Sequence, residues 1–532
     1  MQKRLMFLFS ILVLSFVMVG CTSDKETSYE VAEPSENFNE TGFPIVSESI
    51  EINMTGAKKP DQADWNEMIV LQEYAEKTGI NVNFEPVPGP GWEEKRNLLL
   101  SSGDLPDAFF KAGLSQSDIV TYGSQGVFIP LNDLIDQYAP NIKAMFDEYP
   151  EIKKSVTAPD GNIYVLPQAV NYLAPRIEKP WINKTWLDNL GLEVPTTTDE
   201  YYQALKAFVE EDPNGNGQAD ELGYSGPPRL PRFFEIIRGS FGLGNAGYQS
   251  GNFDLDSDGN VRFYPIEEGY KQMLEYSKKM YEDGLIDEEI FVQNNNWVGK
   301  GQQGIVGSFI ANNSLTMGDK VDDYVAMDAL EGPNGDTLYS PVKPMVQVQG
   351  TFAITSENDY PAETIRWVDY FYGKEGSKMI RMGIEGETYE VKDNGELAYL
   401  DKILNNPDGM SFDQAIGQYT MWTGGNMPHF IYQESDLTGN SHPAALEGAE
   451  ILKDNIPEDP WPPLLLTTEE QQRIAGIQTD IDTYVQEMSA KFVAGSEPLS
   501  NWDEYVSTIE QMGVEDYIEV MQAAYTRYKE AE

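Results

Sequence analysis

The stretch at positions 212–221, DPNGNGQADE, carries the sharpest chemical pattern in this sequence. Its oxygen-bearing groups recur at short intervals, at Asp212, Asn214, Asn216, Gln218, Asp220 and Glu221. With Gly217 where a tight turn is needed, this is the beginning of an EF-hand-like loop, in which the Gln218 carbonyl is the fourth ligand. The twelfth position is Gly223 instead of glutamate, so Asp220 and Glu221 would close the shell early.

Carboxylate, amide and carbonyl oxygens favour Ca²⁺ over zinc or copper, and we expect a structural Ca²⁺ ion here. The alternative is a metal-free loop of Asx turns.

A second aspartate-rich stretch, at 254–259, begins with the same spacing. The residues that follow it include no acid that could complete a metal shell. Asp258-Gly259 lies between Phe253 and Phe263, and this arrangement favours the turn of a β-hairpin over a second metal site.

Several tryptophans stand where a ligand could reach them. Sugars present apolar C–H faces rimmed by hydroxyl groups, which suit flat aromatic rings and planar polar side chains, and 11% of this chain is aromatic. Two of the tryptophans lie in polar, turn-like stretches, and a third falls in the first predicted β-to-α loop. The expected ligand-binding residues are Trp297, Trp422, Trp65, Asp107 and Gln349. The other interpretation of each tryptophan is a core or surface position.

An acidic sugar would need cations in the binding site. Arg176, Arg229 or Arg232 could supply them, but no motif places these arginines there. The calcium-like loop alone does not imply an acidic ligand.

We expect a binding protein and not an enzyme. The chain has only two histidines, His429 and His442, and it contains neither a Gly-x-Ser-x-Gly elbow nor a His-Glu-x-x-His metal motif. Paired carboxylates of a secreted glycosidase are not excluded by counting, because acids are abundant. A peptide-binding protein or a sensor adaptor of the same fold is the remaining alternative.

The first residues predict export and lipidation. Lys3 and Arg4 precede an apolar run at 5–19 that is too short to span a bilayer comfortably, and Cys21 follows. Residues 18–21, Met-Val-Gly-Cys, resemble a bacterial lipobox with Met in place of the usual Leu. We expect a signal peptide at 1–20, a lipid on Cys21, and a flexible polar tether over 21–44.

Size and charge restrict the remaining choices. A chain of 532 residues is too large for one small core and suggests two lobes. The formal net charge of −50 would repel nucleic acid and anionic membrane surfaces, so neither is an expected partner. Because Cys21 is the only cysteine, the mature fold has no internal disulfide. We expect a monomer.

Alternating strands and helices begin the chain. Strand patterns at 45–52, 81–84 and 108–110 are separated by helical patterns from Asn66 and at 92–100, which predicts βαβ units and a mainly parallel sheet. Ligands bind such sheets beyond the carboxyl ends of the strands. Further helices are predicted at 268–283 and 361–371. The C-terminal part is helical: an apolar face from Ile474 to Phe492 follows a capping box at Thr467 and Glu470, and Ser500 with Asp503 is predicted to open another helix.

Several segments together resemble the family 1 extracellular solute-binding proteins of ABC importers. They are 64–66 with 76–80, 102–107 (SGDLPD), 160–167 (DGNIYVLP), 183–187 (NKTWL), 191–200, 352–354 and 365–376. The resemblance runs from about residue 48 to 400, and beyond it only the helical character matches. The calcium-like loop, with its early closure, resembles the calcium site of alginate-binding members.

This resemblance implies an α/β periplasmic-binding-protein-like fold whose two lobes close on a ligand by a hinge. The implied N-terminal lobe comprises residues 45–166 and 349–400, and the implied C-terminal lobe comprises 167–348 and 401–532. The implied function is to capture an oligosaccharide in the interlobe cleft and deliver it to the permease of an ABC transporter. The protein would then lie on the extracellular face of the cell membrane, lipid-anchored through Cys21.

Overall fold

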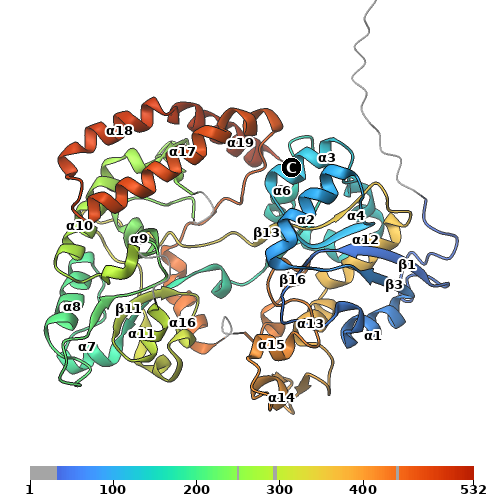
Figure 1. Ribbon diagram of the computed structural model, residues 1–532, viewed down its shortest axis with the longest axis horizontal. Coiled ribbons are helices and arrows are strands. Elements are labelled where there is room, and N and C mark those ends of the chain that lie inside the picture. Colours follow the sequence, from blue (N-terminus) through green and yellow to red (C-terminus); the bar gives the residue numbers. More distant parts are fainter. Residues whose placement is uncertain (1–32, 248–250, 292–295, 439–441, 532) are drawn as a thin grey trace, which may run out of the picture.

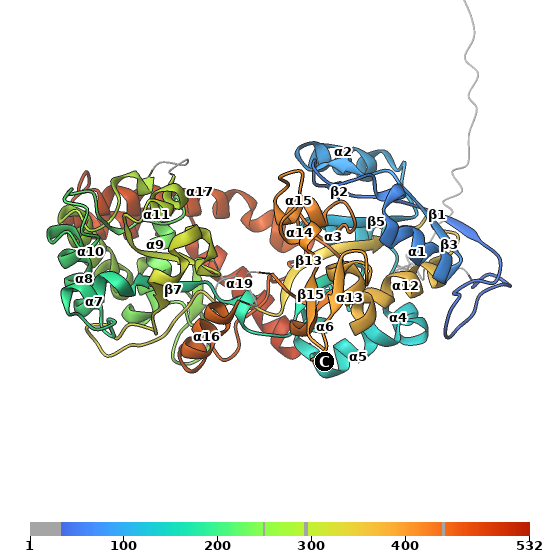
Figure 2. The same ribbon diagram turned by 90° about the horizontal axis from the view of Figure 1, so that it is seen from below.

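Two α/β lobes lie side by side along the long axis of the molecule (Figures 1 and 2). The structure is a computed structural model that describes residues 33–247, 251–291, 296–438 and 442–531. The predicted signal peptide and Cys21 lie outside the described residues. Each lobe is built on its own sheet, and each sheet is flanked by helices.

The first lobe is organised around a six-stranded sheet of order β16-β6-β13-β5-β1-β3. Its strands are β1 (Ile50–Thr55), β3 (Ile80–Phe84), β5 (Ala108–Leu114), β6 (Leu166–Val170), β13 (Val346–Ile354) and β16 (Phe430–Ile431). All run in one direction except β13, which is antiparallel to both of its neighbours. The predicted parallel sheet is therefore interrupted by one returning strand.

Helices cover both faces of this sheet. They are α1 (Ile69–Thr78), α2 (Gly89–Ser102), α3 (Gln116–Ser124), α4 (Asn132–Tyr138), α5 (Pro140–Glu148), α6 (Pro150–Val156), α12 (Pro361–Asp369) and α13 (Lys374–Met382). Helix α1 shows why the apolar spacing in the sequence predicted a helix here. Val70, Leu71 and Tyr74 of α1 face the core, and the helix ends at Gly79, whose φ of 78° lies in the left-handed region that glycine adopts readily. The short strands β2 (Ala57–Lys58) and β4 (Val87–Pro88) pair beside α2.

The second lobe has a four-stranded mixed sheet of order β12-β7-β11-β8. The strands are β7 (Lys179–Asn183), β8 (Leu222–Tyr224), β11 (Val306–Ala311) and β12 (Tyr324–Ala326). Around it lie α7 (Lys184–Leu190), α8 (Thr198–Glu210), α9 (Leu230–Ile237), α10 (Glu268–Glu282), α11 (Trp297–Gln302), the 3₁₀ segment η7 (Ser314–Asp323) and α16 (Pro443–Leu452). The predicted hairpin is present: β9 (Phe253–Leu255) pairs antiparallel with β10 (Val261–Phe263).

The C-terminal part is helical, as predicted, and in the described residues it has three helices where the sequence pattern indicated two. They are α17 (Thr468–Val493), α18 (Trp502–Gln511) and α19 (Val514–Glu530), and they pack on α10 and β10 of the second lobe. The capping box of Thr467 and Glu470 opens α17. The predicted cap at Ser500 was wrong, because the N-cap of α18 is Asn501 and its side chain makes no capping hydrogen bond. One end of this layer also reaches the first lobe, where α17 contacts α3 (Figure 1).

The chain passes from one lobe to the other between β6 and β7, between β12 and β13, and between β16 and α16. Each lobe is therefore discontinuous in sequence. The structure moves one expected boundary: residues 401–431 pack with the first lobe instead of the second. Two short helices, α14 (Asp401–Leu404) and α15 (Phe412–Ile416), form a small cluster with Met382 and the hairpin of β14 (Tyr389–Val391) and β15 (Leu397–Tyr399). The physical reason is that β16 completes the edge of the first sheet, which draws the preceding segment with it.

The tether is also shorter than expected. Residues from Ser35 onward contact the first lobe: the Ser35 amide donates a hydrogen bond to Glu363, and the ring of Phe38 packs edge-on against Tyr138. Arg366 donates to the Asn39 and Gly42 carbonyls. The polar composition of this stretch hid these contacts, because they are made mostly through its backbone.

Candidate ligand-binding cleft

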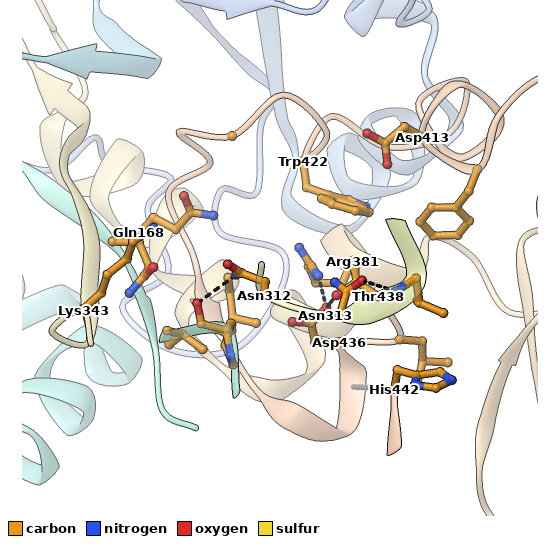
Figure 3. A pocket seen from close by; sticks show the side chains of 18 of the residues that line it. Gln168, Asn312, Asn313, Lys343, Arg381, Asp413, Trp422, Asp436, Thr438 and His442 are labelled. Atoms are coloured by element: carbon orange, nitrogen blue, oxygen red, sulfur yellow. Dashed lines mark hydrogen bonds and ion pairs between the residues drawn. The ribbon is translucent and has the colours of Figure 1, made fainter. Parts of the chain in front are cut away.

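A cavity of about 910 Å³ opens between the lobes (Figure 3). The first lobe contributes Gln168, Val170, Arg381, Phe412, Trp422 and Ile431, and the second contributes Asn312, Asn313 and Leu315. Val170 and Ile431 end their strands β6 and β16, and Asn312 follows the last residue of β11. The cavity thus lies at the carboxyl ends of strands from both sheets, where α/β proteins bind ligands.

Trp422 and Arg381 form the centre of the first-lobe wall (Figure 3). The Arg381 guanidinium lies 4.0 Å from the centroid of the Trp422 ring, a cation–π arrangement. The same guanidinium forms a buried ion pair with Asp436. Asp436 also accepts hydrogen bonds from the Tyr172 hydroxyl at 2.5 Å and from Thr438 Oγ1 at 2.8 Å. Burial opposes the charge of Asp436, but Arg381 and these hydrogen bonds outweigh it and lower the pKa of the carboxyl.

The loop that carries Trp422 is fastened from behind by two buried side chains. Gln62 Nε2 donates to the Met421 and Thr423 carbonyls at 3.2 and 3.0 Å. Lys111, on β5, donates from Nζ to the same two carbonyls, at 2.8 Å to Thr423. Burial, with a smaller contribution from Lys59, lowers the pKa of Lys111 to about 7.

A second buried lysine plays the corresponding part in the other lobe. Lys179, at the start of β7, donates from Nζ to the Ala174 carbonyl at 2.5 Å and to the Asn312 carbonyl at 2.8 Å. Burial lowers the pKa of Lys179 to about 7. Asn312 lines the cavity, so each wall of the cleft rests on a lysine that donates to backbone carbonyls.

Of the tryptophans expected to bind the ligand, the structure brings only Trp422 to the cavity. Trp65 is 0% exposed and packs against Phe84 and Phe110 in the core of the first lobe. Its Nε1 donates to Gln62 Oε1 at 3.3 Å, so it supports the Trp422 loop instead of contacting a ligand. This corrects the expectation for Trp65, and the reason is that its ring packs among the aromatic side chains of the first-lobe core. Trp297 opens α11 in the second lobe and lies half-buried against Phe309, outside the cavity lining.

The expected polar contacts also lie elsewhere. Asp107 precedes β5 at the amino end of that strand and accepts hydrogen bonds from the amide and side chain of Asn53. Gln349 is buried near the start of β13, just after the chain has passed from the second lobe to the first. Its Nε2 donates to the Ser155 carbonyl at 2.6 Å and to the Pro463 carbonyl at 2.9 Å. Both side chains therefore serve the scaffold, and neither lines the cavity.

Sequence reasoning missed most of the lining. Asn312 and Asn313 carried a usable signal, because two polar residues directly follow the apolar strand of β11. Arg381 and Asp436 carried none, since they come from the end of α13 and from the segment after β16 and meet only in the fold.

The calcium-like loop lies on the second lobe, after α8. Asp212 Oδ1 and Oδ2 accept the amides of Asn216 and Gly217 at 3.1 and 2.9 Å, and Gly215 and Gly217 both have positive φ. Asp220 accepts from the Asn216 side chain at 3.0 Å. The two carboxylates are thus held by N–H donors of their own loop.

Glu221 shows that this centre suits a cation. Its Oε1 is buried with no hydrogen-bond partner. Burial first, and then the Asp220 and Asp212 carboxylates, raise the pKa of Glu221. A hard divalent cation would relieve both effects, so the donor set fits Ca²⁺. Within the described ranges, no three or more His, Cys, Asp or Glu residues gather closely enough to hold a metal ion by themselves, so a cation in this loop would also need amide and carbonyl oxygens.

Two α/β lobes with a cavity between them define a binding protein that encloses its ligand. The chain belongs to the bacterial extracellular solute-binding protein family, whose model matches residues 56–378. In the described part of the chain, no helix is long and apolar enough to cross a membrane.

Curated and solved relatives agree with this assignment. The chain is 28% identical to the fructooligosaccharide ABC transporter substrate-binding protein FusA of Streptococcus pneumoniae over 98% of its own length and 97% of that protein. A structure of FusA with kestose covers 91% of this chain and 100% of that one, with a TM-score of 0.74. The structure of alginate-binding protein AlgQ2 without calcium ion is 25% identical, covers 91% of this chain and 100% of that one, and has a TM-score of 0.70. Lipoprotein LipO of Bacillus subtilis is 25% identical over 86% of this chain and 88% of that protein.

Proposed function

We propose that this protein captures an oligosaccharide in the cavity between its lobes and delivers it to the permease of an ABC importer. The observation that carries the proposal is the Trp422 ring, which is backed by Arg381 on one face and lines a cavity of about 910 Å³. An aromatic platform of this kind suits the C–H face of a sugar, and the amides of Gln168, Asn312 and Asn313 suit its hydroxyl groups. The likeness to FusA along nearly the whole chain supports the same ligand class.

The role is binding without chemistry. His429 is buried in the first lobe, and His442, which lines the cavity, caps α16 with its side chain by accepting the amide of Ala444 at 3.3 Å. The charged groups at the cavity are engaged in ion pairs, as Arg381 with Asp436 shows. The relatives named above are substrate-binding proteins, and this supports the same role for the present chain.

Calorimetry of the mature chain against a panel of oligosaccharides and peptides tests the proposal. We expect one-to-one binding of an oligosaccharide without release of reducing ends. Trp422→Ala should weaken that binding at least tenfold, or by more than ~1.4 kcal/mol, because the ring that stacks on the sugar is lost. Phe43→Ala, which removes an exposed aromatic ring outside the cavity, is the matched control. Hydrolysis of a bound glycan, or binding of peptides alone, would contradict the proposal.

The 212–221 loop is proposed to hold a structural calcium ion through Asp212, Asn214, Asn216, the Gln218 carbonyl, Asp220 and Glu221. The buried Glu221 oxygen without a hydrogen-bond partner supports this, as do the Asp220 and Asp212 carboxylates, which raise the pKa of Glu221. Solved relatives include an EF-hand mutant of FusA and AlgQ2 without calcium ion, which points to calcium chemistry in similar proteins. When bound, the ion would supply positive charge that stabilises the loop and has no part in ligand chemistry.

Export and lipidation at Cys21 are proposed from the N-terminal sequence, with the mature protein held at the extracellular face of the membrane. The likeness to LipO, a lipoprotein, supports this. Cys21→Ser should shift the protein from the membrane fraction to the medium. A Cys21→Ser protein that stays with the membrane would contradict the lipid anchor.

A further inference from the structure

The charged side chains that line the cavity are balanced. Among the described lining residues, the lysines and arginines are Lys343 and Arg381, and the acids are Asp413 and Asp436. Two cations thus face two anions, in a chain whose formal net charge is −50. A ligand that carries carboxylates needs a cation that is free to pair with it.

Arg381 is already engaged on two sides. It is 5% exposed, pairs with Asp436, and stacks on Trp422 at 4.0 Å. A ligand carboxylate could take this guanidinium only by separating it from Asp436. That would leave the buried carboxylate of Asp436 uncompensated, which is the most unfavourable way to break such a pair.

Lys343 is the other cation, and it is also occupied. Its Nζ lies 4.0 Å from Glu178, which is ion-paired with Arg232 as well. Burial, together with the neighbouring Arg232 charge, lowers the pKa of Lys343. Asp413, at the rim, lies 3.5 Å from Lys59.

The arginines that the sequence offered for an acidic sugar do not change this balance. Arg176 donates from Nε to the Lys343 carbonyl at 2.9 Å, and Arg232 pairs with Glu178 and Glu235. Arg229 is exposed and does not line the cavity.

We propose that this cavity selects uncharged oligosaccharides over uronate-containing ones of equal length, and that the Arg381–Asp436 pair sets the selectivity. The inference rests on the proposed function and makes it more specific. Similarity to known proteins does not decide whether the ligand is neutral or acidic. FusA is named for fructooligosaccharides, which are neutral, and AlgQ2 is named for alginate, which is acidic.

The test compares neutral and acidic ligands of equal length on the unaltered mature protein. Calorimetry with fructose, galactose and mannose tri- and tetrasaccharides and with oligogalacturonates and oligoalginates should show a neutral ligand bound at least a hundredfold more tightly than any acidic one. Raising the salt from 50 to 500 mM should leave the neutral affinity unchanged within about twofold, since no ion pair forms with the ligand. An acidic ligand that binds as tightly as the best neutral one would overturn this inference and leave the proposed function standing. Failure of every saccharide to bind would overturn the proposed function itself and this inference with it.

A variant assigns the selectivity to the pair. Asp436→Asn releases Arg381, so the preference for neutral over acidic ligand should fall at least tenfold. Asp107→Asn makes the same chemical change outside the cavity and should leave the preference unchanged. Arg229→Ala should also leave it unchanged. If a folded Asp436→Asn protein still rejects uronates fully, the Arg381–Asp436 pair does not set the selectivity.

Discussion

Trp422 owes its position to groups that are far from it in sequence. Gln62 and Lys111 reach the 421–423 loop from more than 300 positions away, and Trp65 holds Gln62 in turn. Lys111 is 1% exposed and has a φ of 53°, a backbone conformation that costs a lysine some strain. These features are expected where a loop must be held in one geometry for a ligand.

Replacing Lys111 with Met should therefore loosen the binding wall. Two backbone carbonyls lose their amine donor, although Gln62 still reaches both. We expect ligand affinity to fall about tenfold, equivalent to ~1.4 kcal/mol, with a change in Trp422 fluorescence. Lys392→Met, at an exposed position, is the control. Unchanged affinity and fluorescence in Lys111→Met would show that Gln62 alone suffices.

His429 predicts a pH dependence of stability. The side chain is fully buried, and burial, with a contribution from Arg381, lowers its pKa to about 3. The unfolded chain binds a proton on this histidine below pH ~6.5, whereas the folded chain does not until pH ~3. Stability from this group is therefore complete above pH 6.5 and is lost as the pH falls toward 3.

Urea denaturation of His429→Gln should measure this contribution. Between pH 7 and pH 5 the unaltered protein should lose ~2 kcal/mol more than His429→Gln, because only the unaltered chain gains a proton at position 429 on unfolding. His442→Gln, the other histidine, should behave like the unaltered protein. Equal losses in His429→Gln and the unaltered protein would mean that His429 titrates alike in both states.

The candidate site was only partly predictable at this scale. A polar, turn-like setting correctly marked Trp422 as unsuited to the core, and a β-to-α loop wrongly suggested exposure for Trp65. The difference is that the Trp65 ring packs against Phe84 and Phe110 of neighbouring strands, and local sequence patterns do not show contacts of this kind.

At the scale of elements, prediction succeeded where local rules decide the structure. The capping box of α17 and the Asp258-Gly259 turn between β9 and β10 follow from side-chain chemistry within a few residues. It failed for the 401–431 segment, because the position of β16 at the sheet edge depends on pairing with β6. Edge pairing between distant strands leaves little trace in either sequence.

The 212–221 loop should respond to chelation as an element. Adding EDTA to the calcium-loaded protein should lower the melting temperature by several degrees, since an ion that binds only the folded state stabilises it by mass action. Asp212→Ala should abolish this difference. Asp256→Ala, in the hairpin with the same initial spacing, is the matched control and should keep it. If chelator does not change the melting temperature of the unaltered protein, the loop does not hold a stabilising calcium ion.

At the scale of the whole molecule, the two-lobed α/β architecture was predictable from the βαβ pattern, the length and the family resemblance. The boundaries were not, because the chain crosses between lobes inside stretches that look like ordinary loops. We expect the hinge at these crossings. One of them leads into β13, where Gln349 donates hydrogen bonds to the Ser155 and Pro463 carbonyls.

Ligand should draw the lobes together about these crossings. Small-angle scattering should show a smaller radius of gyration with saturating oligosaccharide than without it. Trp422→Ala at the same ligand concentration, chosen below its weakened Kd, should show little change. An identical radius with and without bound ligand would mean that the cavity is filled without closure.

The central place of β13 also governs the order in which the molecule can be assembled. This strand lies between β5 and β6, yet it is made more than 170 residues after β6, and β16 follows later still. A chain emerging from its amino end therefore carries two unjoined halves of a sheet until residue 354 is available. The second lobe likewise lacks the helices at 468–530 that cover its core. Neither lobe can complete its fold until late in synthesis, and such a delay would suit the export proposed for this chain, because a translocation pore admits only unfolded polypeptide.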